Sequence, residues 1–418
     1  MSSRHLLSLL FLLSTIVPLG VSAATAVKVK VLETVKIHES HKYGYFPSIH
    51  MLSTGELICD FSLDGDKHDA EGGFWGYVIS NDKGKTWGMR NTAGFIFREV
   101  AFTRDPALPD GSLMMLGGYP LPSAGDDYRN INASSVSIGN GGKTITLSRD
   151  VVVSLPKPAA RQKMSDTVEN FASLGPGKIK EAAFMFFSGT TVSSQDGGWL
   201  ALMYGKLEGD EFFRTIVVKA DRSGKKWQYV STVAGDEAAR ESLKAEGEVG
   251  TEGFTEPNMI RLKDGRLFMA LRRGSDNQMY KSWSTDDGKS WSKPSSLGFK
   301  GVEPAMMEMS NGLVVVSTGR PGPIGVHVSE DAGKTWGHFT PVADYAVRQK
   351  AEAATALNEG HPHRRQSSTC YTGLVEVEPG KLLVVYDHLP YVEGWGLNPA
   401  DKPEAMNSIY GTFLQFSR

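Results

Sequence analysis

Glu256 and Arg272 are spaced so that both could act on one ligand. Glu256 opens the phrase EPNMIRLKDGRLFMALR, and Arg272 closes it. The phrase reads as two strands joined by a turn at Asp264-Gly265, and such a hairpin returns its two ends to the same side. Arg273 should point the opposite way, because side chains alternate along a strand. An edge glutamate with a solvated arginine is the alternative, since surface charges are common.

A second concentration of titratable groups lies in the loop DGDKHDAEGG. Its five members fall within eight residues: Asp64, Asp66, His68, Asp69 and Glu71. Repulsion between like charges could raise the pKa of one carboxyl, as a general acid requires. A solvated acidic loop is the alternative, and a metal site around His68 lacks a diagnostic spacing. His361 and His363, in EGHPHRRQSS, could line the same mouth or belong to a plain surface loop.

These groups must be positioned by the secondary structure around them. One sequence pattern recurs along the chain, a short turn with glycine followed by β-forming residues. Its turn glycines are Gly55, Gly111, Gly197, Gly265, Gly312 and Gly380. Each copy predicts two strands joined by a hairpin. Repeats of this size, rich in short strands, predict an all-β fold, a six-bladed β-propeller in which each blade is one four-stranded sheet.

A polar octapeptide tipped with tryptophan recurs beside these hairpins. SNDKGKTW (Ser80 to Trp87), STDDGKSW (Ser284 to Trp291) and SEDAGKTW (Ser329 to Trp336) share one pattern, with weaker copies at 138–145 and 220–227. We expect it to join the two outer strands of a blade. Its aspartate would bind backbone N–H groups, its glycine would supply a positive φ, and its tryptophan would cover the sheet.

The octapeptides match the Asp-box, or BNR repeat, and with the six hairpins the chain resembles the sialidase superfamily over roughly residues 40–418. The resemblance implies an exo-alpha-sialidase-like glycoside hydrolase that removes a terminal acidic sugar from a glycan, without a cofactor. A neutral tyrosine deprotonated by a glutamate approaches a sugar that carries a carboxylate more easily than a charged nucleophile does.

The family's residues can be placed on this sequence one by one. The resemblance implies that Tyr371, in CYTGL, is the nucleophile, that Glu256 is its base and that Asp69 is the general acid. Arg272 and Arg320 would hold the substrate carboxylate. Four further residues are tied to substrate binding: Arg365 and its neighbour Arg364 as rivals of Arg320, Glu303 as a rim carboxylate or a partner of an arginine, and Tyr45.

Tyr45 marks a departure from the family pattern. The family begins with an arginine in Arg-Ile-Pro, whereas this chain reads Gly44-Tyr45-Phe46-Pro47. A phenol cannot replace the charge of a guanidinium. Two other functions therefore stay open: a propeller lyase or hydrolase acting on uronic-acid polysaccharide, and a non-catalytic glycan-binding propeller.

The remaining features concern location and class. The formal charge of −2 gives no footprint for nucleic acid or for an anionic membrane. Residues 1–23 resemble a secretory signal peptide cleaved after about Ala23, so we expect a secreted or periplasmic chain with a single propeller over 24–418 and no integral membrane segment. Cys59 and Cys370 could pair or remain buried thiols. Short helices are expected within 157–173, 236–246 and 344–359.

Overall fold

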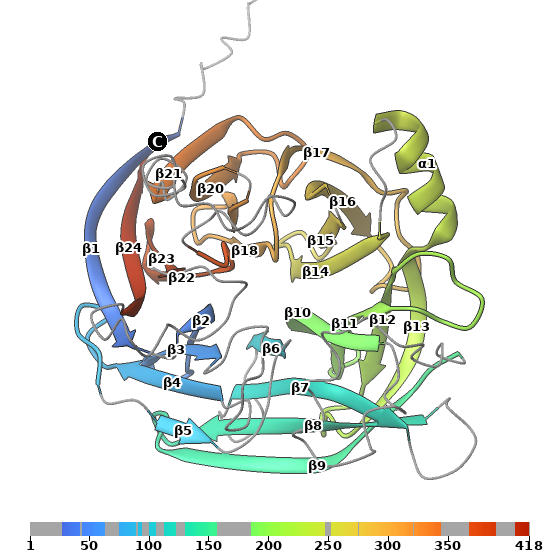
Figure 1. The fold of residues 1–418 in the computed structure, drawn as a ribbon, viewed down its shortest axis with the longest axis horizontal. Coiled ribbons are helices and arrows are strands. Elements are labelled where there is room, and N and C mark those ends of the chain that lie inside the picture. Colours follow the sequence, from blue (N-terminus) through green and yellow to red (C-terminus); the bar gives the residue numbers. More distant parts are fainter. Residues whose placement is uncertain are drawn as a thin grey trace, which may run out of the picture.

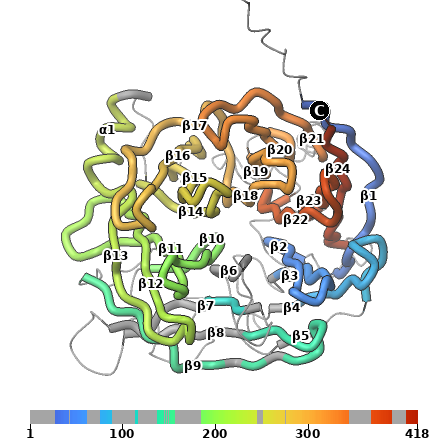
Figure 2. Tube along the Cα trace, turned by 180° about the vertical axis from the view of Figure 1, so that it is seen from behind, coloured from blue at the N-terminus to red at the C-terminus, as the bar shows by residue number. Residues whose placement is uncertain are grey.

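The computed structural model arranges β-sheets in a ring, following one another in chain order around a central axis (Figures 1 and 2). It describes residues 27–41, 44–62, 75–88, 91–93, 100–105, 113–122, 130–156, 185–246, 252–274, 276–320, 322–343, 368–389 and 406–417. Within these ranges one α-helix, α1 (Asp236–Glu246), lies at the outer edge of the ring, where a helix is expected. No helix of these ranges is long and apolar enough to cross a membrane.

Four of the sheets are separate and four-stranded. Their members, from the centre outwards for the first three, are β2 (Tyr45–Met51), β3 (Leu57–Ser62), β4 (Trp75–Ser80) and β5 (Asn91–Ala93); β14 (Phe254–Arg261), β15 (Leu267–Arg273), β16 (Gln278–Ser284) and β17 (Ser295–Lys300); β18 (Ala305–Glu308), β19 (Val314–Thr318), β20 (Ile324–Ser329) and β21 (His338–Ala343); and finally β22 (Thr372–Glu378), β23 (Lys381–His388), β24 (Asn407–Ser417) and β1 (Lys28–Ser40). Strand β1 closes the ring, because this N-terminal strand pairs with β24 near the C-terminus.

The fifth sheet departs from the expected six separate blades. Its strands are β6 (Val100–Asp105), β7 (Leu113–Pro122), β8 (Asn130–Gly139), β9 (Thr144–Ser154), β10 (Met185–Ser193), β11 (Trp199–Gly205), β12 (Arg214–Ala220) and β13 (Lys226–Ala234). Parallel pairs β6–β10 and β9–β13 join two antiparallel runs into one closed eight-stranded sheet. The propeller is confirmed, but six separate sheets are not. Local turns predict hairpins, whereas these lateral parallel pairs link segments distant in sequence.

Every expected hairpin is an antiparallel pair. The pairs are β2–β3, β6–β7, β10–β11, β14–β15, β18–β19 and β22–β23. Of the strands whose burial is described, β10, β14, β15 and β23 are buried on both faces along most of their length, and β11 and β19 are buried throughout. The core is accordingly divided into clusters between neighbouring sheets, such as the one that joins Leu200 and Val217 to Met259 and Leu267.

The three Asp-box octapeptides form the same turn between the two outer strands of a sheet. In the second, the Ser284 hydroxyl donates to Asp286 Oδ1 at 2.8 Å, and Asp286 accepts the Ser290 N–H at 2.9 Å. The indole N–H of Trp291 donates to the Gly288 carbonyl at 3.1 Å. The hydroxyl and N–H of Ser290 and the hydroxyl of Ser284, which all donate to Asp286, lower the pKa of this carboxyl to about 2. The expected role of the octapeptide in the turn is confirmed.

Each Asp-box also inserts into the sheet that precedes it around the ring. A Cβ on Gly84 would lie 2.6 Å from Leu383 of the last sheet, and one on Gly333 would lie 2.8 Å from Phe268 of β15. Gly288 similarly faces Val217 of β12. At Gly84 and Gly333 the approach is too close for a side chain, whereas a Cβ on Gly288 would meet Val217 at an ordinary contact distance of 3.5 Å. The repeat therefore closes its own hairpin and also packs against the neighbouring sheet.

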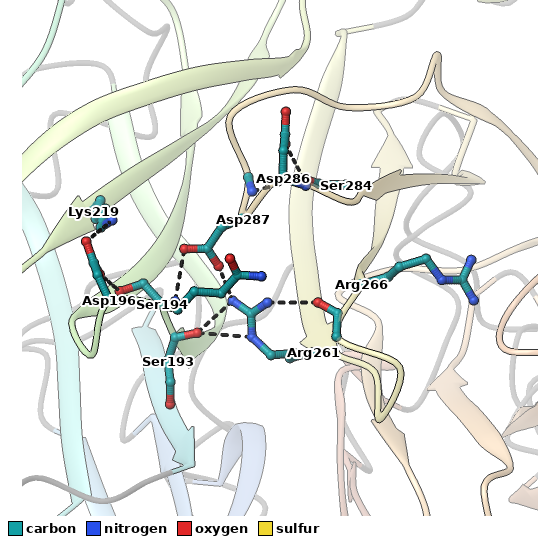
Figure 3. A network of polar contacts seen from close by, with 12 residues as sticks. Ser193, Ser194, Asp196, Lys219, Arg261, Arg266, Ser284, Asp286 and Asp287 are labelled. Carbon is teal, nitrogen blue, oxygen red and sulfur yellow. Dashed lines mark hydrogen bonds and ion pairs between the residues drawn. The ribbon is translucent and has the colours of Figure 1, made fainter.

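A partly buried ion pair links the two sheets at one of these junctions (Figure 3). Arg261 of β14 donates from Nη2 to the Ser193 carbonyl at 2.7 Å and pairs with Asp287 of the Asp-box. The second oxygen of Asp287 accepts the Gln195 N–H at 3.0 Å. One aspartate therefore ties the β16–β17 turn to the β10–β11 turn of the neighbouring sheet.

Gly333→Ala should destabilise the protein strongly. Its φ of 85° disfavours any Cβ, and that Cβ would meet the buried ring of Phe268. We expect roughly 2–4 kcal/mol lower free energy of unfolding, the sum of backbone strain and overpacking. Gly312→Ala is the matched control, because its φ of 83° is similar but nothing lies within 4 Å. Equal losses in denaturant unfolding would contradict the inter-sheet role.

Candidate active site

The candidate site lies at the centre of the ring, where the inner strands begin. Glu256 of β14 is 6% exposed. Its Oε1 accepts the Tyr371 hydroxyl at 2.7 Å and also pairs with Arg272 Nη1, while its Oε2 accepts the Glu303 backbone N–H at 2.9 Å. Arg272, Glu303 and Tyr371, all singled out from the sequence, thus contact the one carboxylate of Glu256. The residue order of the hairpin explains part of this arrangement, because Thr255 is paired with Arg272 across β14 and β15.

The pKa values of Glu256 and Tyr371 follow from their burial and from the nearby guanidiniums of Arg272 and Arg320. Burial favours a neutral Glu256, but Arg272 and the Tyr371 hydrogen bond outweigh it and hold the pKa of this carboxyl below its ordinary value. Burial raises the pKa of Tyr371 well above its usual range, and the carboxylates of Glu256 and Glu303 raise it further. The resting state is therefore a neutral phenol hydrogen-bonded to an ionised carboxylate.

Arg320 and Glu303 complete the described part of this centre. Arg320 is 8% exposed and donates from Nη2 to the Thr369 carbonyl at 2.8 Å, two residues before Tyr371. Glu303 accepts the Ser188 hydroxyl at 3.4 Å. Arg273 points elsewhere, as expected: it is 1% exposed and donates to the Ser242 carbonyl of α1 at 2.9 Å.

The first sheet contributes two neighbouring aromatic residues, Tyr45 and Phe46. Tyr45 stands where the family pattern has its first arginine. Tyr45 is 1% exposed. The ring of Phe46 lies 4.9 Å from that of Tyr371, centroid to centroid. Sequence reasoning did not single out Phe46, although its place before Pro47 matches that of Glu256 before Pro257.

The backbone at these strand starts repeats one unusual conformation. Phe46, Glu256, Glu303 and Cys370 have φ values of 54°, 45°, 32° and 65°. Positive φ at residues with a side chain costs on the order of 1–3 kcal/mol each and clusters at functional sites. The bulge between Thr255 and Asn258 belongs to the same feature, because it turns Glu256 out of the regular ladder.

Asp387 is a second residue that sequence reasoning missed. It is 0% exposed and accepts hydrogen bonds from Ser368, Thr369 and the Phe46 N–H. The only signal in the sequence is a charged residue after the apolar run LLVVY. Burial raises the pKa of Asp387, although its hydrogen bonds oppose the rise.

Two predicted residues, Asp69 and Arg365, lie outside the described residues, as do the other members of the acidic loop and the two loop histidines. Among the described residues, no group of three His, Cys, Asp or Glu side chains is placed to hold a metal ion. Cys59 and Cys370 are buried free thiols, and burial raises the pKa of Cys370 to about 12.

Sheets in a ring with Asp-boxes between their outer strands define a β-propeller, and its centre holds a buried Tyr–Glu–Arg cluster. The comparisons agree with this class. Residues 159–345 match the BNR repeat-like domain. No curated protein sequence matches the chain.

Solved structures with similar folds include enzymes and one protein of unknown function. A protein of unknown function from Dyadobacter fermentans is 18% identical, with a TM-score of 0.59, over 93% of this chain and 99% of that one. The NanB sialidase of Streptococcus pneumoniae is 13% identical, with a TM-score of 0.55, over 90% and 70%. An alpha-L-arabinanase of Penicillium chrysogenum is 14% identical, with a TM-score of 0.56, over 91% and 98%. The resemblance to the sialidase superfamily is confirmed for the fold and its BNR repeats.

Proposed function

We propose that this protein is an exo-acting glycoside hydrolase that removes a terminal acidic sugar through the Tyr371–Glu256 pair. The observation that carries the proposal is the 2.7 Å hydrogen bond from the Tyr371 hydroxyl to Glu256, inside a buried centre. Structural tyrosines commonly bond backbone or hydroxyl groups. A phenol held on an ionised carboxylate is the arrangement that a tyrosine nucleophile needs.

In the first step, the Tyr371 oxygen forms a bond to the anomeric carbon while the bond to the leaving oxygen breaks. The phenol proton passes to Glu256 Oε1, and the leaving oxygen takes a proton from the general acid, for which Asp69 is our candidate. Water then bonds to the anomeric carbon as the bond to the tyrosine oxygen breaks; the water gives one proton to the general-acid carboxylate, and the tyrosine oxygen regains its proton from Glu256. Because its pKa is raised, Tyr371 should lose its proton only as attack proceeds.

Arg272 and Arg320 are proposed to bind the carboxylate of the sugar. Arg272 is largely buried, with 12% of its side chain exposed, and its Nε has no hydrogen-bond partner among the described residues. Charge-assisted bonds to a guanidinium contribute about 1.5–3 kcal/mol each. Arg365 and Glu303 are proposed to border the same pocket, with Tyr45 supporting Phe46 from behind.

A neutral terminal sugar is the second candidate substrate. Tyr45 stands where the family pattern places an arginine, and the next residue, Phe46, packs its ring against Tyr371. Of the charged residues described at this centre, two carboxylates, Glu256 and Glu303, already face two guanidiniums, Arg272 and Arg320. A neutral sugar would leave that balance unchanged.

Two further proposals concern the whole chain. The closed eight-stranded sheet is best understood as two blades, β6–β9 and β10–β13, which gives a six-bladed propeller. The N-terminal segment 1–23 is proposed to direct export, consistent with a glycan substrate outside the cytoplasm.

The proposed function is tested by incubating the purified protein with fluorogenic sialosides, arabinofuranosides and uronides. Release from the sialoside supports the leading proposal. Release only from the neutral glycoside supports the second candidate. New absorbance from an unsaturated uronide indicates a lyase, and glycan binding without any turnover indicates a binding propeller; either result overturns the hydrolase proposal.

The ionised Glu256 carboxylate should stabilise the fold at neutral and mildly acidic pH and should lose this contribution only in stronger acid. Because the folded pKa is lowered, ionised Glu256 stabilises the fold fully above its unfolded pKa of about 4.3, and this contribution is lost as pH falls through the lower folded value. The difference in Tm between wild type and Glu256→Gln should therefore persist down to about pH 4.3 and close below it. Closure already above pH 5.5 would contradict the assigned direction of the shift.

A further inference from the structure

We propose that Asp387 is a positioning residue that fixes the backbone carrying Tyr371. This inference rests on the proposed function, because it concerns the geometry of the same nucleophile. Asp387 lies in β23 and is 0% exposed, with both carboxylate oxygens bonded to donors of the surrounding backbone and hydroxyls, so it is not placed to contact a sugar. Its effect must pass through its neighbours.

The carboxylate of Asp387 gathers four donors. Oδ1 accepts the Ser368 hydroxyl at 2.6 Å and the Thr369 N–H at 2.8 Å. Oδ2 accepts the Thr369 hydroxyl and, at 3.2 Å, the Phe46 N–H. Ser368, Thr369 and Asp387 are all 0% exposed, so water does not compete for these bonds.

Two hydroxyls extend the hold of Asp387 to the next two residues. The Ser368 hydroxyl accepts the Cys370 N–H at 2.8 Å, and the Thr369 hydroxyl accepts the Tyr371 N–H at 3.3 Å. Three successive backbone N–H groups, at 369, 370 and 371, are therefore fixed by one carboxylate, directly or through one hydroxyl. Cys370, in the middle, has a φ of 65°, a conformation that the surroundings must enforce.

The Asp387 carboxylate is also bonded to the Phe46 backbone directly and is connected to Arg320 through Thr369. Its bond to the Phe46 N–H links the first sheet to the last, and the Phe46 ring packs against Tyr371. Thr369, which Asp387 holds by its N–H and hydroxyl, accepts Arg320 at its carbonyl. Loosening Asp387 should thus shift Tyr371 relative to Glu256, and small displacements of a reacting group cost about 10²-fold in rate.

A charged acceptor is required, because every group that contacts Asp387 donates. An asparagine would place its NH₂ group against at least one of these donors. Asp387→Asn should therefore lower kcat by roughly 10²-fold and raise KM by less, because Arg272, the other arginine proposed to hold the substrate carboxylate, pairs with Glu256 and not with the 369–371 backbone.

The matched control is Asp287→Asn. Asp287 is also a buried carboxylate between two sheets, but it belongs to the Asp-box junction with Arg261. This control should lower Tm with kcat unchanged. A second pair keeps the proposal testable if Asp387→Asn does not fold: Thr369→Val removes the hydroxyl that holds the Tyr371 N–H and should lower kcat, whereas Thr369→Ser retains it and should restore kcat.

Hydrogen exchange separates this proposal from the proposed function. In Asp387→Asn or Thr369→Val, the amides of 369–371 should exchange at least tenfold faster than in Asp287→Asn, whether or not any glycoside is cleaved. Wild type without turnover would overturn the proposed function alone. Unchanged exchange at 369–371, or equal kcat for Thr369→Val and Thr369→Ser in an active enzyme, would overturn the positioning role of Asp387.

Discussion

Tyr371→Phe should abolish turnover while leaving the fold intact. The substitution removes one oxygen, which is the atom proposed to bond the anomeric carbon and the donor to Glu256 at 2.7 Å. Loss of a nucleophile that acts as a unit with its base costs roughly 10³-fold or more in kcat. The measurement is release of a fluorogenic leaving group at saturating substrate, with Tm recorded in parallel.

Tyr229→Phe is the control for this result. Its hydroxyl contacts Thr232 at 3.1 Å on the outer strand β13, away from the inner strands. We expect its kcat to equal that of wild type. If Tyr371→Phe retains more than about a tenth of the wild-type kcat, a tyrosine nucleophile is excluded, although the propeller assignment survives.

Glu256→Gln is expected to have the second largest effect, on activity and stability together. The amide cannot take the phenol proton, so kcat should fall by about 10²–10⁴-fold. It also leaves the buried Arg272 without its ion-pair partner, and breaking such a pair by neutralising one side costs about 3–5 kcal/mol. Denaturant unfolding and initial rates measure the two losses separately.

The comparison that interprets this variant is a double substitution with Tyr371→Phe. Because the two residues act as a pair, the double variant should lose about as much kcat as either single variant. Glu308→Gln serves as a control, because Glu308 of β18 only accepts the Lys263 N–H and lies partly exposed. Fully multiplicative losses in kcat would show that Glu256 and Tyr371 act independently.

Much of the fold could be predicted because its signals are local. A glycine turn between two β-forming runs is sufficient to indicate a hairpin, as at Gly265, and the Asp-box pattern from Ser284 to Trp291 specifies its own turn through side-chain bonds. The helix at 236–246 was recognisable from its composition. The pairing of β6 with β10 was not, since parallel pairing depends on lateral contacts that no short stretch encodes.

In the candidate site, too, some contacts could be predicted from the sequence and others could not. Glu256 and Arg272 share one hairpin, so their approach follows from strand geometry. Tyr371 and Glu256 are separated by 115 residues, and only the closed ring brings the hydroxyl onto the carboxylate. The resemblance to a family singled out Tyr371, but the spacing of residues alone would not have joined it to Glu256.

By itself the sequence determined the repeated hairpins, the Asp-box turns and the residue types available for chemistry, because these depend on neighbours within a few residues. Tertiary structure alone decided that Phe46 lies against Tyr371 and that Asp387 holds, directly or through a hydroxyl, the N–H groups of 369, 370 and Tyr371 itself. The first contact depends on the first and last sheets meeting where the ring closes, whereas the second lies within the last sheet, where β22 pairs with β23. The physical reason is that ring closure fixes contacts between residues more than 300 positions apart, such as Phe46 and Asp387.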